Sequence, residues 1–388
     1  MQNIDKQYIL SGSPLLTSKG RGVLVIILAI IFASAIGGMV MLGASAVIGA
    51  YGWMLYVVFG CAATFYLLTR LNVKTSFRWF QIGTMLFVAL QTAFIAALLN
   101  SLSPRQLQTV GFIEEGVKII PALLLYIFLP KLVRTRKDAM VFGALGGLGF
   151  NLIEIALYMS QTMIKGELTM IETIYVHTTR LGLLGFGTHI IWSMFVGLGL
   201  GMTIEGKNVG WRRWRPFILV YLLIAVTHSA YDSGLIGLTL IVSIVMVIIA
   251  KREPLTLDGV RVQDAGQPGT LREAMILEHY VYNVIYIVLL VIQLFRTSRL
   301  EQEFTVEQLV SESDEVVSEK EKNLIAAEGR WRSRRYADYP KTIGRRIIKL
   351  QNLLAREKAL GDGSVGSQSL IAGLRQSIIE LKKEGVAG

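Results

Sequence analysis

Acidic, basic and histidine residues interrupt the apolar middle of the sequence, and their types could do hydrolytic chemistry. They are Glu114, Glu115, Lys118, Glu154, His189, His228 and Asp232. A charged side chain at the centre of a bilayer costs roughly 2.5–3.5 kcal/mol on insertion, so such residues persist where a function offsets the penalty. We therefore take these seven residues as candidate catalytic residues.

Their spacing predicts specific pairs, because residues four apart share one face of a helix. Glu114 and Lys118 have this spacing, and so do His228 and Asp232. We expect Lys118 to hold Glu114 ionised and Asp232 to orient His228. Glu115 should point about 100° away from Glu114 around the helix axis.

Together these groups supply what attack of water on a peptide carbonyl requires. A glutamate can act as base and acid, while His189 and His228 can donate to an oxyanion. We favour this route, which needs no cofactor. A divalent metal such as zinc is the alternative, with the two histidines and a glutamate as ligands and one open position. The sequence has no H-E-x-x-H pattern, which would indicate a zinc site directly.

The elements that position these residues are membrane helices. The chain of 388 residues is 53% hydrophobic and only 17% charged, whereas soluble domains are about a quarter charged. A span needs about 20 apolar residues. We predict an all-α, polytopic bundle of eight transmembrane helices, or nine if 275–295 also crosses. The eight predicted spans are 23–43, 48–69, 79–99, 112–129, 140–160, 181–203, 216–232 and 234–250.

Lys and Arg cluster in every second loop, beginning with Lys19 and Arg21 before the first span. This pattern places the N-terminus in the cytoplasm of a multi-pass cell-membrane protein. Basic cytoplasmic loops explain the net charge of +11 without nucleic acid as a partner. With this orientation and the rise of a helix, the candidate residues fall within roughly 15 Å of the outer surface.

We divide the chain into five parts. These are a cytoplasmic leader (1–20), N-terminal transmembrane helices (21–110), a catalytic transmembrane core (111–250), a linker with the uncertain apolar helix (251–300) and a polar helical tail (301–388). Apolar residues at helical spacing on both sides of Gly361 predict a small helical hairpin in the tail. The single cysteine, Cys61, can form no intrachain disulfide.

Four ordered motifs within residues 110–235 resemble those of the PrsW family of membrane proteases, which is distantly similar to the CAAX prenyl endopeptidases and their bacterial relatives. The motifs are Glu114-Glu-Gly-Val-Lys118, Gly149-Phe-Asn-Leu-Ile-Glu154 with Tyr158, the stretch from Arg180 to His189, and His228-Ser-Ala-Tyr-Asp232. One position departs from the family pattern, because Ile155 stands where the family usually has asparagine. Asn151, one turn earlier, could substitute for it.

The resemblance implies proteolysis of membrane-tethered proteins, with anti-sigma factors as the best-known substrate type. Two other classes of function stay open at this stage. A transporter or channel could use the polar cluster to relay protons or ions. A non-catalytic scaffold could capture membrane proteins through the same site. The sequence does not indicate an oligomeric state.

Overall fold

The computed structural model of the chain is helical, with no strand among the residues that it describes. The structure describes residues 7–11, 13–71, 78–103, 106–166, 187–206, 209–232, 270–327, 339–361 and 364–387. The prediction of an all-α fold is confirmed for these parts of the chain.

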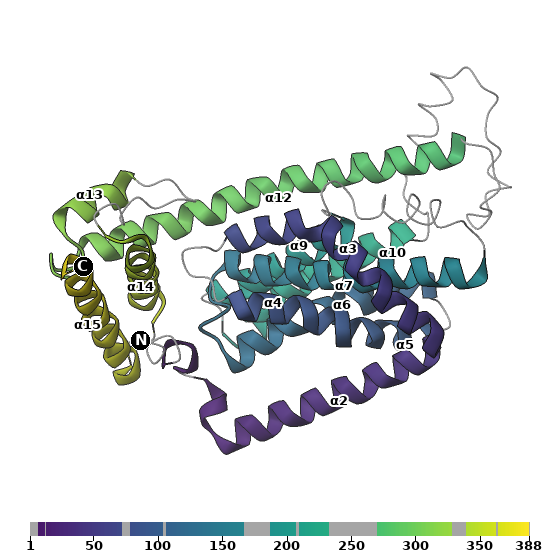
Figure 1. Ribbon diagram of the computed structural model, residues 1–388, viewed down its shortest axis with the longest axis horizontal. Helices are drawn as coiled ribbons and strands as arrows, with labels where there is room; N and C mark the ends of the chain where they lie inside the picture. The colour runs from purple at the N-terminus through teal and green to yellow at the C-terminus, as the bar shows by residue number, and fades with distance from the viewer. Residues whose placement is uncertain are drawn as a thin grey trace.

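The first two thirds of the described chain form a bundle of long helices (Figure 1). A single π-helical turn, Val88–Thr92, joins the two halves of the third apolar helix. The helices of the bundle are α2 (Ser18–Leu42), α3 (Ala44–Leu71), α4 (Arg78–Phe87), α5 (Ala93–Leu102), α6 (Gln106–Phe128), α7 (Arg136–Lys165), α9 (Thr188–Glu205) and α10 (Arg215–Asp232).

Four of these helices are long and apolar enough to cross a membrane: α2, α3, the continuous helix from Arg78 to Leu102, and α7. They coincide with four predicted spans. The structure also has helices where spans were predicted at 112–129, 181–203 and 216–232, namely α6, α9 and α10. These three helices carry all of the candidate site residues except Glu154, which belongs to α7. The predicted span 234–250 lies outside the described residues, so the total of eight or nine spans is not established.

Helix α7 forms the centre of the bundle, where most of its side chains are buried. It packs antiparallel against α9 through glycines. A Cβ atom at Gly143 would lie 2.3 Å from the carbonyl oxygen of Ser193, and one at Gly147 would lie 2.3 Å from that of His189. Small residues let helix backbones approach closely in a membrane. The glycines of α7 therefore determine how close the site residues of α9 come.

Two ends of the bundle can be distinguished by their residues. One end, called the basic end, contains the start of α7 and the connection before it, with Lys131, Arg134 and Arg136. Thr135 and Asp138 form a capping box that fixes the start of α7. The opposite end, called the site end, contains the last turn of α10 and the first turn of α9.

The remaining helices form a small second body, called the C-terminal module, at the basic end of the bundle (Figure 1). It comprises the last turns of α12 from residue 301 together with three shorter helices. These are α13 (Glu319–Ala327), α14 (Lys341–Leu360) and α15 (Val365–Ala387). The predicted hairpin is present as α14 and α15, whose buried apolar residues include Leu350, Leu354, Leu370 and Leu374. Tyr8 from the start of the chain is buried in the same small core.

The uncertain apolar run at 275–295 belongs to one long helix, α12 (Thr270–Val310). This helix runs along the side of the bundle and reaches the C-terminal module with its last turns (Figure 1).

Candidate active site

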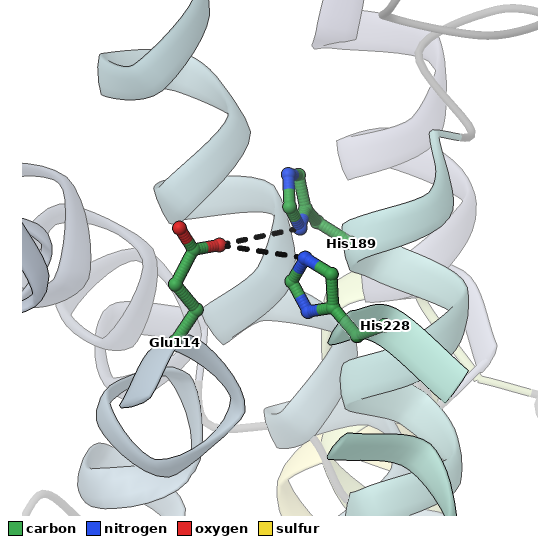
Figure 2. Close-up of side chains that lie close together, drawn as sticks. All are labelled: Glu114, His189 and His228. Atoms are coloured by element: carbon green, nitrogen blue, oxygen red, sulfur yellow. Dashed lines mark ion pairs between the residues drawn. The ribbon is translucent and has the colours of Figure 1, made fainter. Parts of the chain in front are cut away.

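Three helices bring the candidate residues together at the site end of the bundle. Glu114 comes from α6, His189 from the first turn of α9, and His228 from the last turns of α10 (Figure 2). Oε2 of Glu114 lies 4.0 Å from Nδ1 of His189 and 3.6 Å from Nε2 of His228. The three ligand-type atoms all lie within 4.8 Å of one another, which makes the group a candidate metal site.

Lys118 lies at the centre of this cluster and its side chain is fully buried. Its Nζ is 3.3 Å from Glu114 Oε2, 2.8 Å from Glu115 Oε1 and 2.6 Å from His189 Nδ1. The ring of Phe150 covers the ammonium group at 4.2 Å. The expected pair with Glu114 is therefore present, but the closer carboxylate is that of Glu115. A long lysine side chain can reach the residue three positions back as well as the one four back.

Glu115 faces into the cluster, and both of its carboxylate oxygens accept hydrogen bonds. Oε1 lies 3.0 Å from Nδ1 of His228, and Oε2 accepts a bond of 3.0 Å from the Ser193 hydroxyl. Neither Glu115 nor His228 is exposed to solvent. A buried carboxylate with fixed partners on each oxygen has a defined orientation, which suits it to proton transfer.

Glu154 and Asp232 complete the set from two further positions. Oε2 of Glu154 lies 2.8 Å from Nε2 of His189, and the Tyr158 hydroxyl lies 3.4 Å from Oε1 of the same carboxylate. Asp232 lies 3.2 Å from Nε2 of His228, and its side chain is one third exposed. The structure thus brings all seven sequence-predicted residues into one connected cluster. Arg180, which begins the third motif, lies outside the described residues.

Close contacts between backbones fix the positions of the three site helices. The Gly111 amide donates a hydrogen bond of 3.0 Å to the Ser229 hydroxyl, next to His228. A Cβ atom at Gly146 would lie 2.2 Å from the carbonyl oxygen of Lys118. A glycine therefore stands opposite each of these site segments, and the polar groups meet because the backbones can approach.

Two residues that the sequence analysis did not select also contact the glutamates. The Asn100 side chain at the end of α5 donates to Oε1 of Glu114 at 3.4 Å, and Ser193 donates to Glu115. Ser193 lies four residues after His189, so helical spacing could have identified it. Nothing in the spacing links Asn100 to Glu114, because the two residues lie on different helices.

Aromatic side chains enclose the polar cluster. Trp192 lies with its ring centroid 4.2 Å from that of His228, and Phe150 lies 5.2 Å from His189. Phe150 and Tyr158, which belong to the second motif, both contact site residues: Phe150 packs against His189, and the Tyr158 hydroxyl faces Glu154. Enclosure by apolar rings excludes water and strengthens the electrostatic interactions among the buried groups.

Each imidazole has one nitrogen near a glutamate outside the candidate metal group and the other nitrogen on the side of Glu114. On that side, Lys118 lies closer to His189 and Asp232 lies closer to His228 than Glu114 does. His189 contacts Glu154 through Nε2, and His228 contacts Glu115 through Nδ1. Metal-binding histidines usually have this arrangement, in which a carboxylate holds the nitrogen that does not bind the metal.

A sequence model of a known protein family matches residues 52–251, from α3 to beyond α10. That family is described as PrsW family intramembrane metalloprotease, and the match covers more than half of the chain. It is broader than the region of the four motifs, since it includes α3, α4 and α5. No curated protein and no solved structure matches the chain significantly. With its motifs, its apolar helices and this match, the chain belongs to the PrsW family of intramembrane metalloproteases.

Proposed function

We propose that this membrane protease cleaves proteins that are anchored by a membrane helix, at or just outside the outer end of that helix. The observation that carries the proposal is the convergence of Glu114, His189 and His228 within 4.8 Å at one end of the bundle, with Glu115 and Glu154 directly behind the histidines. Regulatory proteins such as anti-sigma factors are the substrate type that fits this location.

The donor set fits a divalent metal ion such as zinc. A tetrahedral zinc site places neighbouring donor atoms about 3.3 Å apart. The separations of 3.6 and 4.0 Å around Glu114 Oε2 need only a small contraction to reach that value. Asp232 is one third exposed and is left out of this count. If Glu114, Glu115 and Glu154 are ionised and Lys118 is protonated, the histidines being neutral, the more deeply buried part of the cluster carries an excess of two negative charges. A divalent cation would neutralise this excess, as burial of charge in a membrane requires.

The family description as a metalloprotease therefore supports the metal alternative over the metal-free route that we favoured from the sequence alone. Glu114 Oε2, His189 Nδ1 and His228 Nε2 would hold the ion. When bound, the ion would polarise the substrate carbonyl and acidify water. Lys118 Nζ contacts two of these three atoms, so its side chain must withdraw by a small amount to admit the ion.

The remaining groups of the chain have separate tasks in this scheme. Glu115 accepts and returns a proton, because it is the buried carboxylate closest to both Lys118 and His228. Glu154 orients the His189 ring through Nε2. Asp232, which is partly exposed beside His228, can pass a proton toward the aqueous side.

The proposed place of cleavage follows from the position of the cluster at the site end, away from the basic end. Basic loops face the cytoplasm, so the site end faces outward in the proposed orientation. The carbonyl groups of an intact helix are hydrogen-bonded and poorly accessible, so the substrate must present an extended segment there. Helix-breaking residues near the outer end of the substrate helix should therefore speed cleavage.

The test uses purified full-length protein in proteoliposomes with a single-pass protein substrate. His228→Ala should abolish cleavage and reduce bound metal from near one ion per chain. Thr227→Ala is the matched control, because Thr227 precedes His228 and its hydroxyl bonds only along its own helix, to the Leu223 carbonyl. Full cleavage by His228→Ala, or product ends mapped by mass spectrometry to the cytoplasmic end of the substrate helix, would contradict the proposal.

A further inference from the structure

The C-terminal module contacts the basic end of the bundle through buried ion pairs that lie outside the active site. Arg356 of α14 donates from Nη1 and Nη2 to the two oxygens of Asp138, at 3.0 and 3.1 Å. The side chains of Arg356 and Asp138 are only 3% and 1% exposed. This is the bidentate geometry in which arginine binds a carboxylate most strongly.

Two further acidic residues of the module extend the interface. Glu301 of α12 accepts from Arg356 at 2.5 Å and from Lys137 at 2.6 Å. Glu357, next to Arg356, accepts from Lys131 and Arg134 at 2.5 Å each. Buried charges are tolerated when each has a partner of opposite sign, so this set fixes one specific way of docking.

The start of the chain belongs to the same assembly. Tyr8 is buried in the core of the module, and its ring lies beneath Lys131 at 5.9 Å. The Ser13 hydroxyl donates to the carbonyl of Phe128, at the end of α6. The N-terminal segment, the connection from α6 to α7 and the C-terminal module therefore lie on one side of the bundle.

Helix α12 links this side to the opposite one. Its 41 residues make a helix about 60 Å long, enough to pass along the whole bundle, as Figure 1 shows. Large apolar side chains in its middle are exposed, including Val284, Val288, Ile292 and Phe295. A continuous exposed apolar face of this length fits a helix that faces lipid.

We infer that α12 is a membrane crossing that runs from the site side to the basic side, and that it places the C-terminal module beside the N-terminal segment. The chain then leaves α10 and enters α12 on the same side of the membrane.

Cysteine labelling of the full chain in intact cells tests the path of α12. In a Cys61→Ser background, single cysteines replace Val365 in the module, Val209 in a basic loop, and Lys165 at the opposite end of α7. Val365 and Val209 are each 84% exposed. A membrane-impermeant maleimide should label Lys165→Cys alone in intact cells and all three after permeabilisation. Labelling of Val365→Cys together with Lys165→Cys would overturn the inference.

A charge exchange tests the docking separately. Asp138→Arg and Arg356→Asp should each expose the module to limited proteolysis in inverted vesicles, with cleavage at least tenfold faster than in the unchanged protein. The double variant should recover most of the protection. Arg299→Asp is the control, since the pair of Arg299 with Glu303 is exposed. A double variant as sensitive as the single ones would show that the pair does not hold the module. The readout is independent of peptidase activity and of metal.

Discussion

The bundle buries two clusters of charged side chains, and they differ in their balance of charge. At the docking interface, acidic and basic groups are nearly matched. The three acids there are Asp138, Glu301 and Glu357, and the four bases are Lys131, Arg134, Lys137 and Arg356. In the candidate active site, Lys118 is the ammonium group that contacts the carboxylates of Glu114 and Glu115, while Glu154 contacts His189.

We interpret the docking interface as a structural cluster and the site cluster as a reactive one. At the interface each carboxylate has at least one arginine or lysine within 3.2 Å, so all three acids are neutralised and one basic group is in excess. In the site, the excess of carboxylates and the two histidines leave capacity for a cation and for protons. Ionisable groups in strongly perturbed surroundings gather at functional sites, whereas a matched set of buried ion pairs can fix one way of assembling the chain.

The largest expected effect is on activity in the unbalanced cluster. Glu115→Gln keeps the shape and the hydrogen-bonding capacity of the side chain but removes its ability to accept a proton. The rate of cleavage should fall by about 10²–10⁴-fold, the usual contribution of general acid–base catalysis. Bound metal and the thermal stability of the purified protein should change little. If Glu115→Gln lost its fold together with its activity, Glu115 would have a structural role like that of the interface ion pairs.

A substitution at the docking interface should instead lower stability and leave activity unchanged. Arg356→Met removes the partner of two buried carboxylates and should lower the free energy of unfolding by about 3–5 kcal/mol, as is usual when one member of a buried pair is lost. Denaturation in detergent micelles measures this change, with Arg299→Met as the exposed control. Activity per folded molecule should be retained. A stability equal to that of the control would show that the interface ion pairs contribute little.

Lys118 tests whether the excess of negative charge in the site cluster favours a metal ion. Its ammonium group contacts Glu114 Oε2 and His189 Nδ1, the atoms proposed to bind the metal. Lys118→Met removes this competing positive charge, and like charges a few ångströms apart repel strongly in a buried site. Metal affinity, measured by competition with a chromogenic chelator, should rise by about tenfold while cleavage falls. A weaker metal affinity in Lys118→Met would show that the lysine supports the ion instead of competing with it.

The smallest expected effect is the response of the interface to acid. Burial alone would raise the pKa of Glu301, but Lys137 and Arg356 outweigh burial and hold that pKa at about 2, below the ordinary value of 4.5. Because the folded-state pKa is lowered, the stabilisation is present above pH 4.5 and is lost as the pH falls from 4.5 toward 2. Protease resistance of the module should be constant from pH 7 to 5 and should decline below pH 4.5. Constant resistance down to pH 2.5 would contradict this linkage.

The sequence by itself determined the helical class, the membrane environment and the seven polar residues of the cluster. Apolar stretches of span length and the high penalty for intramembrane charge are local properties, so they can be seen without coordinates. The hairpin of α14 and α15 was predictable for the same reason, because helical periodicity is local. The pairs Glu114 with Lys118 and His228 with Asp232 also follow from spacing alone.

The tertiary structure decided which helices meet. The contacts of Glu154 with His189, Glu115 with His228, and Asn100 with Glu114 join different helices, and no spacing rule predicts them. They depend on how closely glycines let the backbones approach.

The docking of Arg356 on Asp138 joins residues 218 positions apart, so only the folded chain could reveal it. The same holds for the course of α12. Its apolar run is long enough to cross a membrane, but length does not indicate where the helix begins and ends in space. The buried partners at its last turns supply that information, because a buried charge must lie where its counter-charge is.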